Sequence, residues 1–416
     1  MIDQLHHTLK NCPSPTSSPL RLQVSNSAAA SLHRGHPWLY AEKITEQGRE
    51  GRPGELAVVY DGKKRFVALG LYDPTSPLRL RALRTSQPGP IDASFFAERI
   101  IRALERRRPL LATETDGYRM IHGESDALPG LVVDRYAGTA VVKIYTLAWA
   151  PYLAWILENL LNQQPLERIV LRLSRSVKEH PEFLYGLSDG QILCGPPITN
   201  TLTCLENGLR FEVDPVRGQK TGFFLDQRDN RARVQQMAKG RTVLNAFSYN
   251  GGFSLAAARG GAREVTSLDQ SGPALASSQR NFALNAHIPA VAAAQHHILE
   301  DDAFKAMARL AQQGRTFDLV IVDPPAFAVR RSQLKQALAA YGRLAHLAVK
   351  LLAKNGDIVL ASCSNPVSPE DFRRTMCEAA TQAGRPLRQI QETAHALDHP
   401  LDFTESRYLK CLFATC

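Results

Sequence analysis

The sequence predicts an α/β protein whose C-terminal half is a doubly wound parallel sheet, preceded by a small β-barrel and a small α+β domain. Three observations support this prediction. After about Asn200, apolar runs alternate with helical segments of ten or more residues, as expected of a parallel sheet covered by helices. Before residue 90 the apolar runs are short and separated by turn residues, which is typical of a barrel. A chain of 416 residues is also too long for one ordinary domain.

The composition limits the kinds of protein that this chain can be. Lysine and arginine outnumber aspartate and glutamate by 50 to 40, and the formal charge of +10 favours a polyanionic partner such as nucleic acid. Charge alone would suit an acidic membrane surface equally well, but no apolar run reaches the length of a membrane span. The seven cysteines include no Cys-x-x-Cys pair. We therefore expect reduced thiols, no metal site and a cytoplasmic location.

The N-terminal region is predicted to contain a tail and the small barrel. Residues 1–19 are polar and rich in proline and serine, so we expect a flexible tail rather than a secretory signal, which needs a continuous apolar segment. The barrel is expected over residues 20–90. Its clearest local signal is the Asp61-Gly62 turn between two apolar runs, a pattern typical of hairpins. From Leu78 to Leu83 arginine begins by alternating with apolar residues, which predicts a strand with one cationic face.

The α+β domain is predicted over residues 91–197 and the doubly wound domain over residues 198–416. The α+β domain is expected to contain helices and strands at Ala93–Arg107, Leu131–Asp134, Ala140–Ile144, Leu153–Leu161 and Arg168–Leu171. The later domain is expected to contain strands at Thr242–Ala246, Glu264–Leu268, Phe317–Val322 and Gly356–Ala361. Ligands of parallel sheets bind beyond the carboxyl ends of the strands, so the site is expected there.

The first strand of this sheet runs into a glycine turn at Gly251-Gly252. Asp269 ends the next strand, seventeen residues after Gly252. A carboxylate at that spacing can accept hydrogen bonds from both ribose hydroxyls of a nucleotide-like cofactor. A strand-to-helix turn needs glycine whatever binds, so the glycine pair alone leaves both interpretations open. No Gly-x-x-x-x-Gly-Lys-Ser/Thr phosphate loop is present, which disfavours a site that cradles phosphates.

Two further strand ends carry candidate catalytic groups. Pro324-Pro325 fix the backbone after Asp323 and so present a rigid carboxylate to a planar amine or amide, although the same residues could simply end a strand. Cys363 lies between two serines just beyond a strand, where its side chain can leave the core and act as a nucleophile. A thiol with a pKa of about 8.5 is a few per cent thiolate at neutral pH. Core filling is the alternative, and it is our interpretation of Cys377 and Cys411.

The segment before the first strand of the sheet mixes polar and aromatic residues. Asp226 is expected to cap the N-terminus of a helix that runs through Val234. This role does not explain Lys220 or Phe223-Phe224, which suit a lid over a planar ligand.

Several motifs together resemble one known family, the class I S-adenosylmethionine-dependent ribosomal RNA large-subunit methyltransferases that make 5-methylcytosine. The similar segments are His33–Tyr40, Leu69–Pro74, Gly123–Tyr136, Thr221–Arg228, Asn245–Gly252, Val322–Ala328 and Ser362–Ser364. The match covers nearly the whole chain, and the combination is specific although each motif alone is not. It implies an RNA-binding PUA-like barrel, a central α+β domain and a Rossmann-like methyltransferase domain.

The resemblance also implies roles for individual residues. S-adenosylmethionine would be bound by Phe224, Asp226, Gln227, Asn245, Phe247, Tyr249, Gly251, Asp269, Asp302 and Asp323. The catalytic residues would be Cys363, attacking C6 of a cytosine, and Asp323, bonding the N3/N4 edge of that base. Ribosomal RNA, the implied partner, would be contacted by Arg34, His36, Trp38, Arg79, Arg81, Arg330 and Arg331. The sequence leaves a homodimer open.

The sequence departs from the family pattern at two places, and other activities remain open. Many RNA 5-methylcytosine enzymes carry a second cysteine beside the Asp-Pro-Pro turn, where this chain has Ala326-Phe327. Asn365 stands where histidine is frequent in relatives. The base that removes the C5 proton is therefore not assigned, with water and Asp323 as candidates. Methylation of uridine C5 or guanine N7 on the same fold, and RNA binding without catalysis, are the alternative functions.

Overall fold

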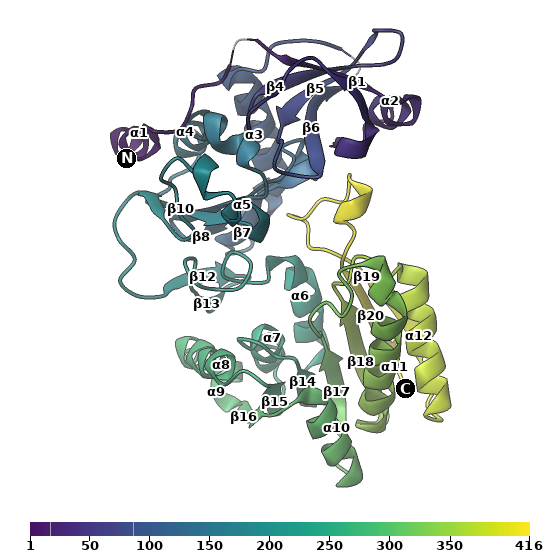
Figure 1. Cartoon of the computed structure of the whole chain (residues 1–416). Coiled ribbons are helices and arrows are strands. Elements are labelled where there is room, and N and C mark those ends of the chain that lie inside the picture. The colour runs from purple at the N-terminus through teal and green to yellow at the C-terminus, as the bar shows by residue number, and fades with distance from the viewer. Residues whose placement is uncertain (17, 86) are drawn as a thin grey trace. The chain divides into compact units, whose positions relative to one another are not determined.

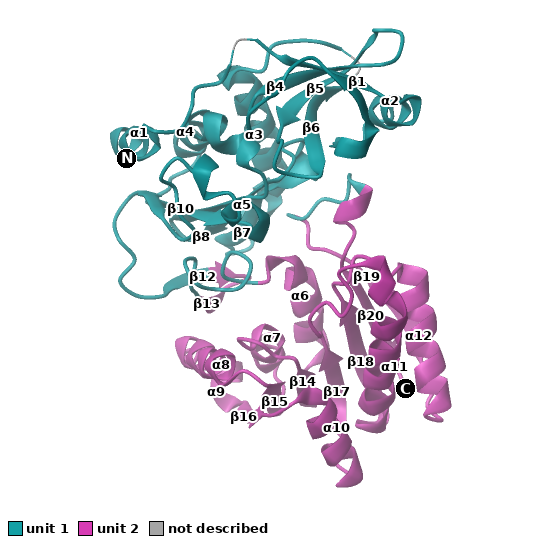
Figure 2. Ribbon diagram, in the orientation of Figure 1, with its two compact units in different colours: residues 1–204, 213–223, 398–403 teal, residues 205–212, 224–397, 404–416 magenta. Residues whose placement is uncertain are grey.

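A computed structural model describes residues 1–16, 18–85 and 87–416, which form two units (Figure 2). Unit 1 contains residues 1–204, 213–223 and 398–403, and unit 2 contains residues 205–212, 224–397 and 404–416. The chain therefore passes between the units five times. Residues 398–403, near the C-terminus, complete unit 1. Among the described residues, no helix is both long and apolar enough to cross a membrane.

The first sheet of unit 1 contains the strands expected of the barrel (Figure 1). Its strands are β1 (Leu20–Val24), β2 (Trp38–Tyr40), β3 (Ile44–Gln47), β4 (Leu56–Tyr60), β5 (Phe66–Tyr72) and β6 (Leu78–Thr85), with helix α2 at Asn26–His33. They lie in the order β2-β6-β5-β4-β1-β3. The predicted hairpin is confirmed, since β4 and β5 pair antiparallel around the Asp61-Gly62 turn. Leu22 of β1, Val59 of β4 and Leu32 of α2 are in the buried core of this sheet.

The N-terminal segment differs from the flexible tail that was expected over residues 1–19. Residues Ile2–Leu9 form helix α1, and Leu5 and Leu9 on one face of it are buried. These two leucines belong to the core of the second sheet of unit 1. The tail prediction is therefore wrong for this helix, because two leucines four residues apart supply an apolar face that the polar composition of the segment conceals.

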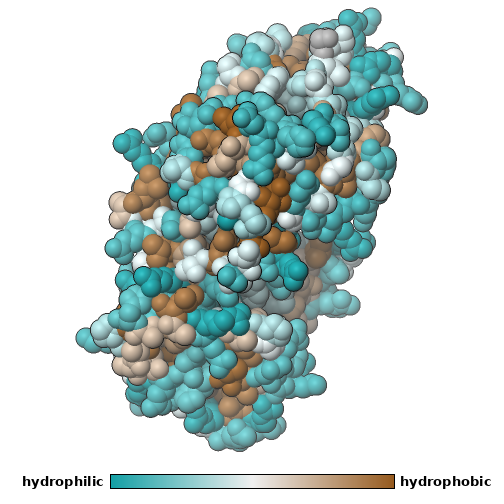
Figure 3. Space-filling model, turned by 90° about the vertical axis from the view of Figure 1, so that its left-hand side faces the viewer, coloured by the Kyte–Doolittle hydropathy of each residue, from teal (hydrophilic) through white to brown (hydrophobic). Residues whose placement is uncertain are grey.

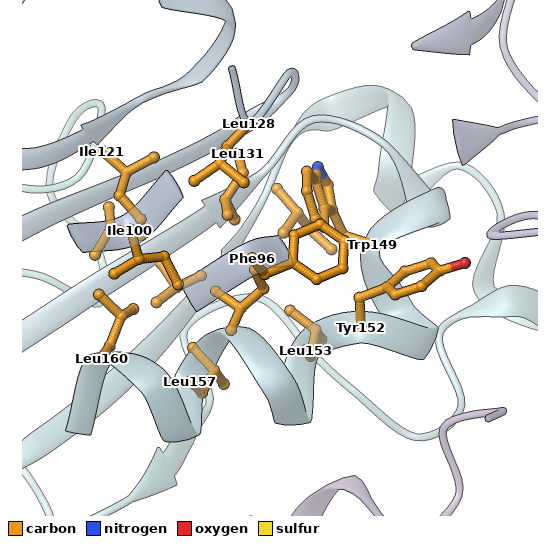
Figure 4. Close-up of a cluster of buried hydrophobic side chains, with 14 of the residues drawn as sticks. Phe96, Ile100, Ile121, Leu128, Leu131, Trp149, Tyr152, Leu153, Leu157 and Leu160 are labelled. Carbon is orange, nitrogen blue, oxygen red and sulfur yellow. The ribbon is translucent and has the colours of Figure 1, made fainter. Parts of the chain in front are cut away.

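The second sheet of unit 1 forms the central α+β domain. Its strands β7 (Gly117–His122), β8 (Leu131–Tyr136), β9 (Thr139–Ile144), β10 (Arg168–Leu173) and β11 (Ile192–Cys194) are accompanied by helices α3 (Ala93–Arg107), α4 (Leu153–Gln163) and α5 (Arg175–Lys178). The strand order is β11-β10-β9-β8-β7. Figure 4 shows a cluster of buried side chains in this domain. The ring centroid of Phe96 lies 5.6 Å from that of Trp149 and 5.5 Å from that of Tyr152.

Buried polar contacts attach two later segments to this domain. Arg107 of α3 forms an ion pair with Asp126, with 2.6 Å between Nη2 and Oδ2, and also donates to the carbonyl of Asp398 at 2.9 Å. The carboxylate of Asp398 accepts the backbone N–H of Arg119 at 2.7 Å. Thr221, from the segment in which a lid was expected, bonds the hydroxyl of Tyr136 at 2.9 Å. Buried polar groups are stable only when paired in this way, so these segments are integral to unit 1.

Unit 2 is a doubly wound α/β domain, as predicted. Its strands are β14 (Thr242–Ala246), β15 (Glu264–Asp269), β16 (Gln295–Glu300), β17 (Phe317–Val322), β18 (Leu352–Ser362), β19 (Arg388–Thr393) and β20 (Lys410–Thr415). Its helices are α6 (Arg228–Met237), α7 (Gly252–Arg259), α8 (Gly272–Leu284), α9 (Pro289–Ala293), α10 (Ala303–Gln312), α11 (Leu334–Lys350) and α12 (Pro369–Gln382). A two-stranded sheet pairs β12 (Leu202–Glu206) with β13 (Leu209–Val213), and its residues are divided between the two units.

The seven strands of unit 2 lie in the order β16-β15-β14-β17-β18-β20-β19. Strands β14 to β18 pair in parallel, and β20 runs antiparallel to both β18 and β19. Leu244, Val320 and Ile358 point to one face of the sheet, where they form a core with α10, α11 and α12. Helix α7 contacts β14 and β15. On the molecular face shown in Figure 3, hydrophilic and hydrophobic side chains are interspersed.

Candidate active site

The candidate site lies at one edge of the sheet of unit 2. The parallel strands β14 to β18 all end at this edge, and the register pairs Ala246 with both Leu268 and Val322. The chain order reverses between β14 and β17, which is the position where doubly wound sheets bind ligands. The predicted residues Phe247, Asp269, Asp302, Asp323 and Cys363 come at or just after the ends of the five strands. The topology thus brings together residues that are up to 116 positions apart in the sequence.

The loop between β14 and α7 has an unusual backbone conformation. Phe247 has φ 60°, Tyr249 has φ 49° and Gly251 has φ 79°, all in the left-handed region. Such strain is uncommon for residues other than glycine, costs about 1–3 kcal/mol for each residue, and clusters at ligand sites. A Cβ atom at Gly251 would lie 2.0 Å from Oγ of Ser278. Glycine is therefore required at this position for steric as well as conformational reasons.

Asp269 holds this strained loop in place. Its Oδ2 accepts the N–H of Tyr249 at 2.8 Å, and its Oδ1 accepts the N–H of Ser271 at 3.0 Å. A carboxylate has about four lone-pair positions, so each oxygen can accept one more hydrogen bond. The geometry is therefore compatible with the predicted acceptance of two ribose hydroxyls by Asp269.

Several buried polar atoms around the loop have no hydrogen-bond partner among the described residues. They are Oδ1 of Asn245, Oγ of Ser248 and Oγ of Ser278. An unsatisfied buried polar atom costs about 1–3 kcal/mol, so native proteins rarely keep one unless a ligand or water supplies the partner. These residues offer one carbonyl and two hydroxyl groups, a set that suits the adenosine and amino-acid parts of S-adenosylmethionine.

The orientation of the Asn245 amide is set by a buried chain of hydrogen bonds. Its Nδ2 donates to Oγ of Ser254 at 2.9 Å, which lies 2.7 Å from Oγ of Ser267, and that hydroxyl lies 2.9 Å from Nε2 of His296. His296 is stacked on Phe282 at 3.7 Å. Burial, with a smaller contribution from His297, lowers the pKa of His296 to about 4. These contacts engage Nδ2 of Asn245 and leave its Oδ1 without a partner among the described residues.

The partly buried His296 is expected to make the protein sensitive to acid. In the unfolded chain the imidazole takes up a proton below about pH 6.5, whereas in the folded chain it does so only near pH 4, so the free energy of unfolding falls as the pH is lowered between these values. The loss between pH 7 and pH 5 is about 2 kcal/mol. Urea titrations at both pH values should show a smaller loss for His296→Gln. The exposed His287 is the matched control, and His287→Gln should behave like the unchanged protein. Equal pH dependence in all three proteins would contradict this account.

Asp323 is oriented by a chain of amide groups. Nε2 of Gln227 donates to Oδ2 of Asp323 at 3.0 Å, and Oε1 of Gln227 accepts from Nδ2 of Asn230 at 2.6 Å. Gln227 ends the short helix η6 (Leu225–Gln227), and Asn230 is in the first turn of α6. Pro324 and Pro325 remove two backbone donors directly after β17. The carboxylate is therefore presented in a fixed direction at the strand end.

Cys363 lies beside the Asp-Pro-Pro turn. Its Sγ is 4.0 Å from the carbonyl oxygen of Pro324, and it is partly exposed, whereas Ser362 and Ser364 on either side are fully buried. Both serine hydroxyls bond the hydroxyl of Tyr341 on α11 at 2.8 Å. Two anchored neighbours thus hold the segment while the thiol faces away from the core. This arrangement can supply a nucleophile next to a fixed carboxylate.

Comparison with known proteins identifies the family. Residues 183–406 match the model of S-adenosylmethionine-dependent methyltransferases, and residues 22–85 match a PUA-like domain. A ribosomal RNA large subunit methyltransferase of Deinococcus radiodurans is 48% identical over 97% of this chain and 99% of its own length. Ribosomal RNA large subunit methyltransferase I of Shewanella denitrificans is 34% identical, over 95% of this chain and 99% of its own length. This chain belongs to the ribosomal RNA large subunit methyltransferase family.

Solved structures show the same fold as this methyltransferase. A protein described as a methyltransferase complexed with SAH has a TM-score of 0.79 at 21% identity, over 95% of this chain and all of that one. A protein from Streptococcus mutans described as a SAM-dependent methyltransferase has a TM-score of 0.78, with the same identity and coverage. The predicted Rossmann-like domain with a PUA-like domain is confirmed, as is S-adenosylmethionine as the cofactor.

Three residues predicted to bind the cofactor have additional structural roles in the methyltransferase. The ring of Phe224 packs edge-on against Tyr249, with centroids 5.1 Å apart, and Asp302 caps α10 by accepting the N–H of Lys305 at 3.0 Å. Asp226 is buried, and its Oδ2 accepts the hydroxyl of Tyr408 at 2.7 Å. The prediction that Asp226 caps α6 is wrong, because Gln227 is the N-cap residue and η6 precedes the helix.

The residues predicted to contact RNA are found in different environments. Arg34, Arg330 and Arg331 are exposed, whereas His36, Trp38 and Arg79 are partly buried. Nε1 of Trp38 donates to Glu124 at 2.9 Å, and its ring lies 4.8 Å from Phe403, so this tryptophan joins separate segments of unit 1. The guanidinium of Arg79 donates to the carbonyl of Pro74.

Arg81 corrects the prediction of a cationic face on β6. Its side chain is 6% exposed, and its Nε would lie 2.9 Å from a Cβ atom at Gly130. The face of β6 that carries Arg81 therefore packs against the central domain instead of solvent. Alternation of arginine with apolar residues indicates two faces but not which of them meets another domain.

Four residues of the site could not be recognised from local sequence patterns. They are Ser254, Ser267 and His296, which orient Asn245, and Tyr341, which anchors both serines beside Cys363. Each acts through a contact with a residue that is distant in the sequence or on a neighbouring element. The part of the chain that the structure describes contains no cluster of three or more His, Cys, Asp or Glu side chains suited to a metal ion.

Proposed function

We propose that this methyltransferase transfers a methyl group to C5 of a cytosine in large-subunit ribosomal RNA, through a covalent bond between Cys363 and C6 of the base. The proximity of a partly exposed thiol to the Asp-Pro-Pro turn, with 4.0 Å between Sγ of Cys363 and the Pro324 carbonyl, is the observation that carries the proposal. The names of the relatives support ribosomal RNA as the substrate. The formal charge of +10 is consistent with a polyanionic partner.

The chemistry of the base explains why a thiol is needed. C5 of cytosine is too weakly nucleophilic to accept a methyl group while the C5–C6 double bond is intact. The Cys363 thiolate adds its electron pair to C6, the C5–C6 π electrons become available at C5, and N3 gains a proton as the ring becomes enamine-like. The carboxylate of Asp323, held by Gln227, is placed to bond the N3/N4 edge of the base and support this protonation. Bound S-adenosylmethionine supplies the electrophilic methyl group.

The enzyme must also be released from its product. Loss of the C5 proton to a base returns the electrons of that C–H bond to the ring, the C5–C6 double bond re-forms, N3 loses its added proton, and the C6–S bond breaks with its electrons remaining on sulfur. Water and Asp323 are the candidate bases. A second cysteine beside the Asp-Pro-Pro turn is not available as this base, because Ala326-Phe327 occupy that neighbourhood.

The test is a covalent trap. RNA carrying 5-fluorocytosine cannot lose its C5 substituent as a proton, so the enzyme should remain bonded to it after methyl transfer and survive denaturing gel electrophoresis. Peptide mapping should place the bond at Cys363, and Cys363→Ala should bind cofactor and RNA without forming the adduct. A matched control is Cys377→Ala on α12, which should be trapped normally. An adduct with another cysteine, or normal turnover by Cys363→Ala, would overturn the proposal, and trapping only by 5-fluorouracil would indicate uridine as the substrate.

A further inference from the structure

Lys410 is a buried cation adjoining the Ser-Cys-Ser segment. It begins β20 and pairs in the antiparallel register with Ser362, the last residue of β18. The residue is 6% exposed. Its Nζ donates to the carbonyl of Ser364 at 2.6 Å and to the carbonyl of Tyr408 at 2.8 Å. Two of the three N–H groups of the ammonium are thereby used, one of them on the residue directly after Cys363.

Burial of this ammonium is costly, and no carboxylate compensates for it. Both acceptors are neutral carbonyls, and Lys410 forms no ion pair with any described residue. A buried lysine is usually paired, because desolvation disfavours the charged form by several kcal/mol. Burial accordingly lowers the pKa of Lys410 to about 8, and the interaction that opposes this effect is with Cys363.

Other titratable groups near Lys410 are engaged elsewhere. The charge of Asp323 adds to the effect of burial in raising the pKa of Cys411, the next residue of β20. The carboxylate of Asp323 also accepts a hydrogen bond from Gln227. Asp226 accepts from the hydroxyl of Tyr408, and the ring of His395 packs edge-on against Tyr408, with centroids 4.4 Å apart. None of these groups changes the pKa of Lys410, so Cys363 is the group to which its charge is coupled.

We propose that Lys410 is a positioning residue whose ammonium stabilises the thiolate form of Cys363 and fixes the backbone that carries it. This inference rests on the proposed function in taking Cys363 as the nucleophile. The S–H bond of Cys363 breaks, the proton passes to solvent, and the electron pair that remains on sulfur attacks C6. When the C6–S bond later breaks, the pair returns to sulfur beside the same ammonium. Lys410 keeps its proton throughout, so it lowers the cost of the negative sulfur at both stages.

The experiment measures the ionisation of Cys363 without RNA. The rate of alkylation by iodoacetamide is followed from pH 5 to pH 10 by mass spectrometry of the peptide that contains Cys363. Three variants separate charge from hydrogen bonding: Lys410→Arg keeps both, Lys410→Gln keeps an N–H donor without charge, and Lys410→Met keeps neither. The partly buried Cys377 is an internal control in every sample, and its alkylation should not change.

We expect the alkylation midpoint of Cys363 to rise by about one pH unit or more in Lys410→Gln and Lys410→Met, as for the loss of a nearby opposite charge, and to stay within a few tenths of a unit in Lys410→Arg. The acidic limb of the pH profile of kcat/KM should shift by the same amount. An unchanged alkylation midpoint of Cys363 in Lys410→Gln would overturn the electrostatic role of Lys410. The Lys410→Gln result decides the question even if the Met or Arg variant fails to fold. This readout is independent of the RNA reaction. If the alkylation midpoint of Cys363 shifted but the enzyme formed no adduct with 5-fluorocytosine RNA, the proposed function would be contradicted. The electrostatic coupling between Lys410 and Cys363 would still stand.

Discussion

Gly251→Ala is expected to weaken binding of S-adenosylmethionine by about 100-fold or more, as measured by isothermal titration calorimetry. Two effects contribute to this loss. Alanine disfavours φ 79°, and its Cβ atom would lie 2.0 Å from Oγ of Ser278 and 2.8 Å from Cβ of the same serine. The loop between β14 and α7 would have to move, which would displace residues that are predicted to bind the cofactor.

Two further variants separate the two effects at Gly251. Gly314 has a similar φ of 69° with nothing within 4 Å of its would-be Cβ atom, so Gly314→Ala should cost about 1 kcal/mol of stability and leave cofactor binding unchanged. Ser278→Gly removes both of the nearest atoms and should recover part of the binding lost in Gly251→Ala. Tight binding by Gly251→Ala alone would show that this loop does not form the cofactor site.

Asp323→Asn is expected to lower kcat by about 10²–10⁴-fold while changing the cofactor affinity only slightly. Asparagine has nearly the same shape and keeps a carbonyl acceptor for Gln227, so the loop should be preserved. It cannot carry the negative charge that supports a protonated N3, and the barrier to attack at C6 should rise. Single-turnover kinetics on RNA substrate and calorimetry with the cofactor measure the two quantities.

A double-mutant cycle tests how Asp323 is oriented. Gln227→Met removes the 3.0 Å hydrogen bond to Asp323 and should lower kcat by a smaller factor than Asp323→Asn. In the Asp323→Asn background the same change should have little further effect, because the group that Gln227 orients has already lost its charge. Additive losses would show that Gln227 acts on catalysis through another group.

Much of the fold follows from local sequence patterns. β14 and β17 begin and end at the predicted residues because each is a short apolar run with turn residues after it, and α3 matches its predicted bounds because polar and apolar residues alternate with a helical period. β16 was not predicted, since His296 and His297 interrupt its apolar character. The candidate site was predictable at the strand ends, because parallel topology determines that they meet.

The supporting residues of the site depend on long-range pairing and were not predictable. Lys410 reaches the carbonyl of Ser364, next to Cys363, only because β20 pairs antiparallel with β18, and no local pattern distinguishes it from an ordinary surface lysine. Tyr341 similarly acts from α11, more than twenty residues before the serines that it anchors. A single sequence also gave no sign that Arg81 is buried within unit 1.

The shared core within unit 1 also affects how RNA binding should be studied. Leu56, Leu69 and Leu83 of the barrel pack in one core with Phe96 and other residues of the central domain. Removing residues 1–90 would expose that core, so the deletion would not isolate a loss of RNA contacts. Substitutions of the exposed Arg34, Arg330 and Arg331 are the appropriate test, with the salt dependence of RNA affinity as the readout.

The discontinuous composition of unit 1 has a consequence for synthesis on the ribosome. Domains generally fold in order as the chain emerges, but the carbonyl and carboxylate of Asp398 are needed by Arg107 and by the backbone of Arg119. Until residue 398 has left the exit tunnel, the backbone N–H of Arg119 and one N–H group of Arg107 lack these acceptors, although Arg107 can already pair with Asp126. Unit 1, which contains the PUA-like barrel, is thus completed only after most of the methyltransferase domain has been translated.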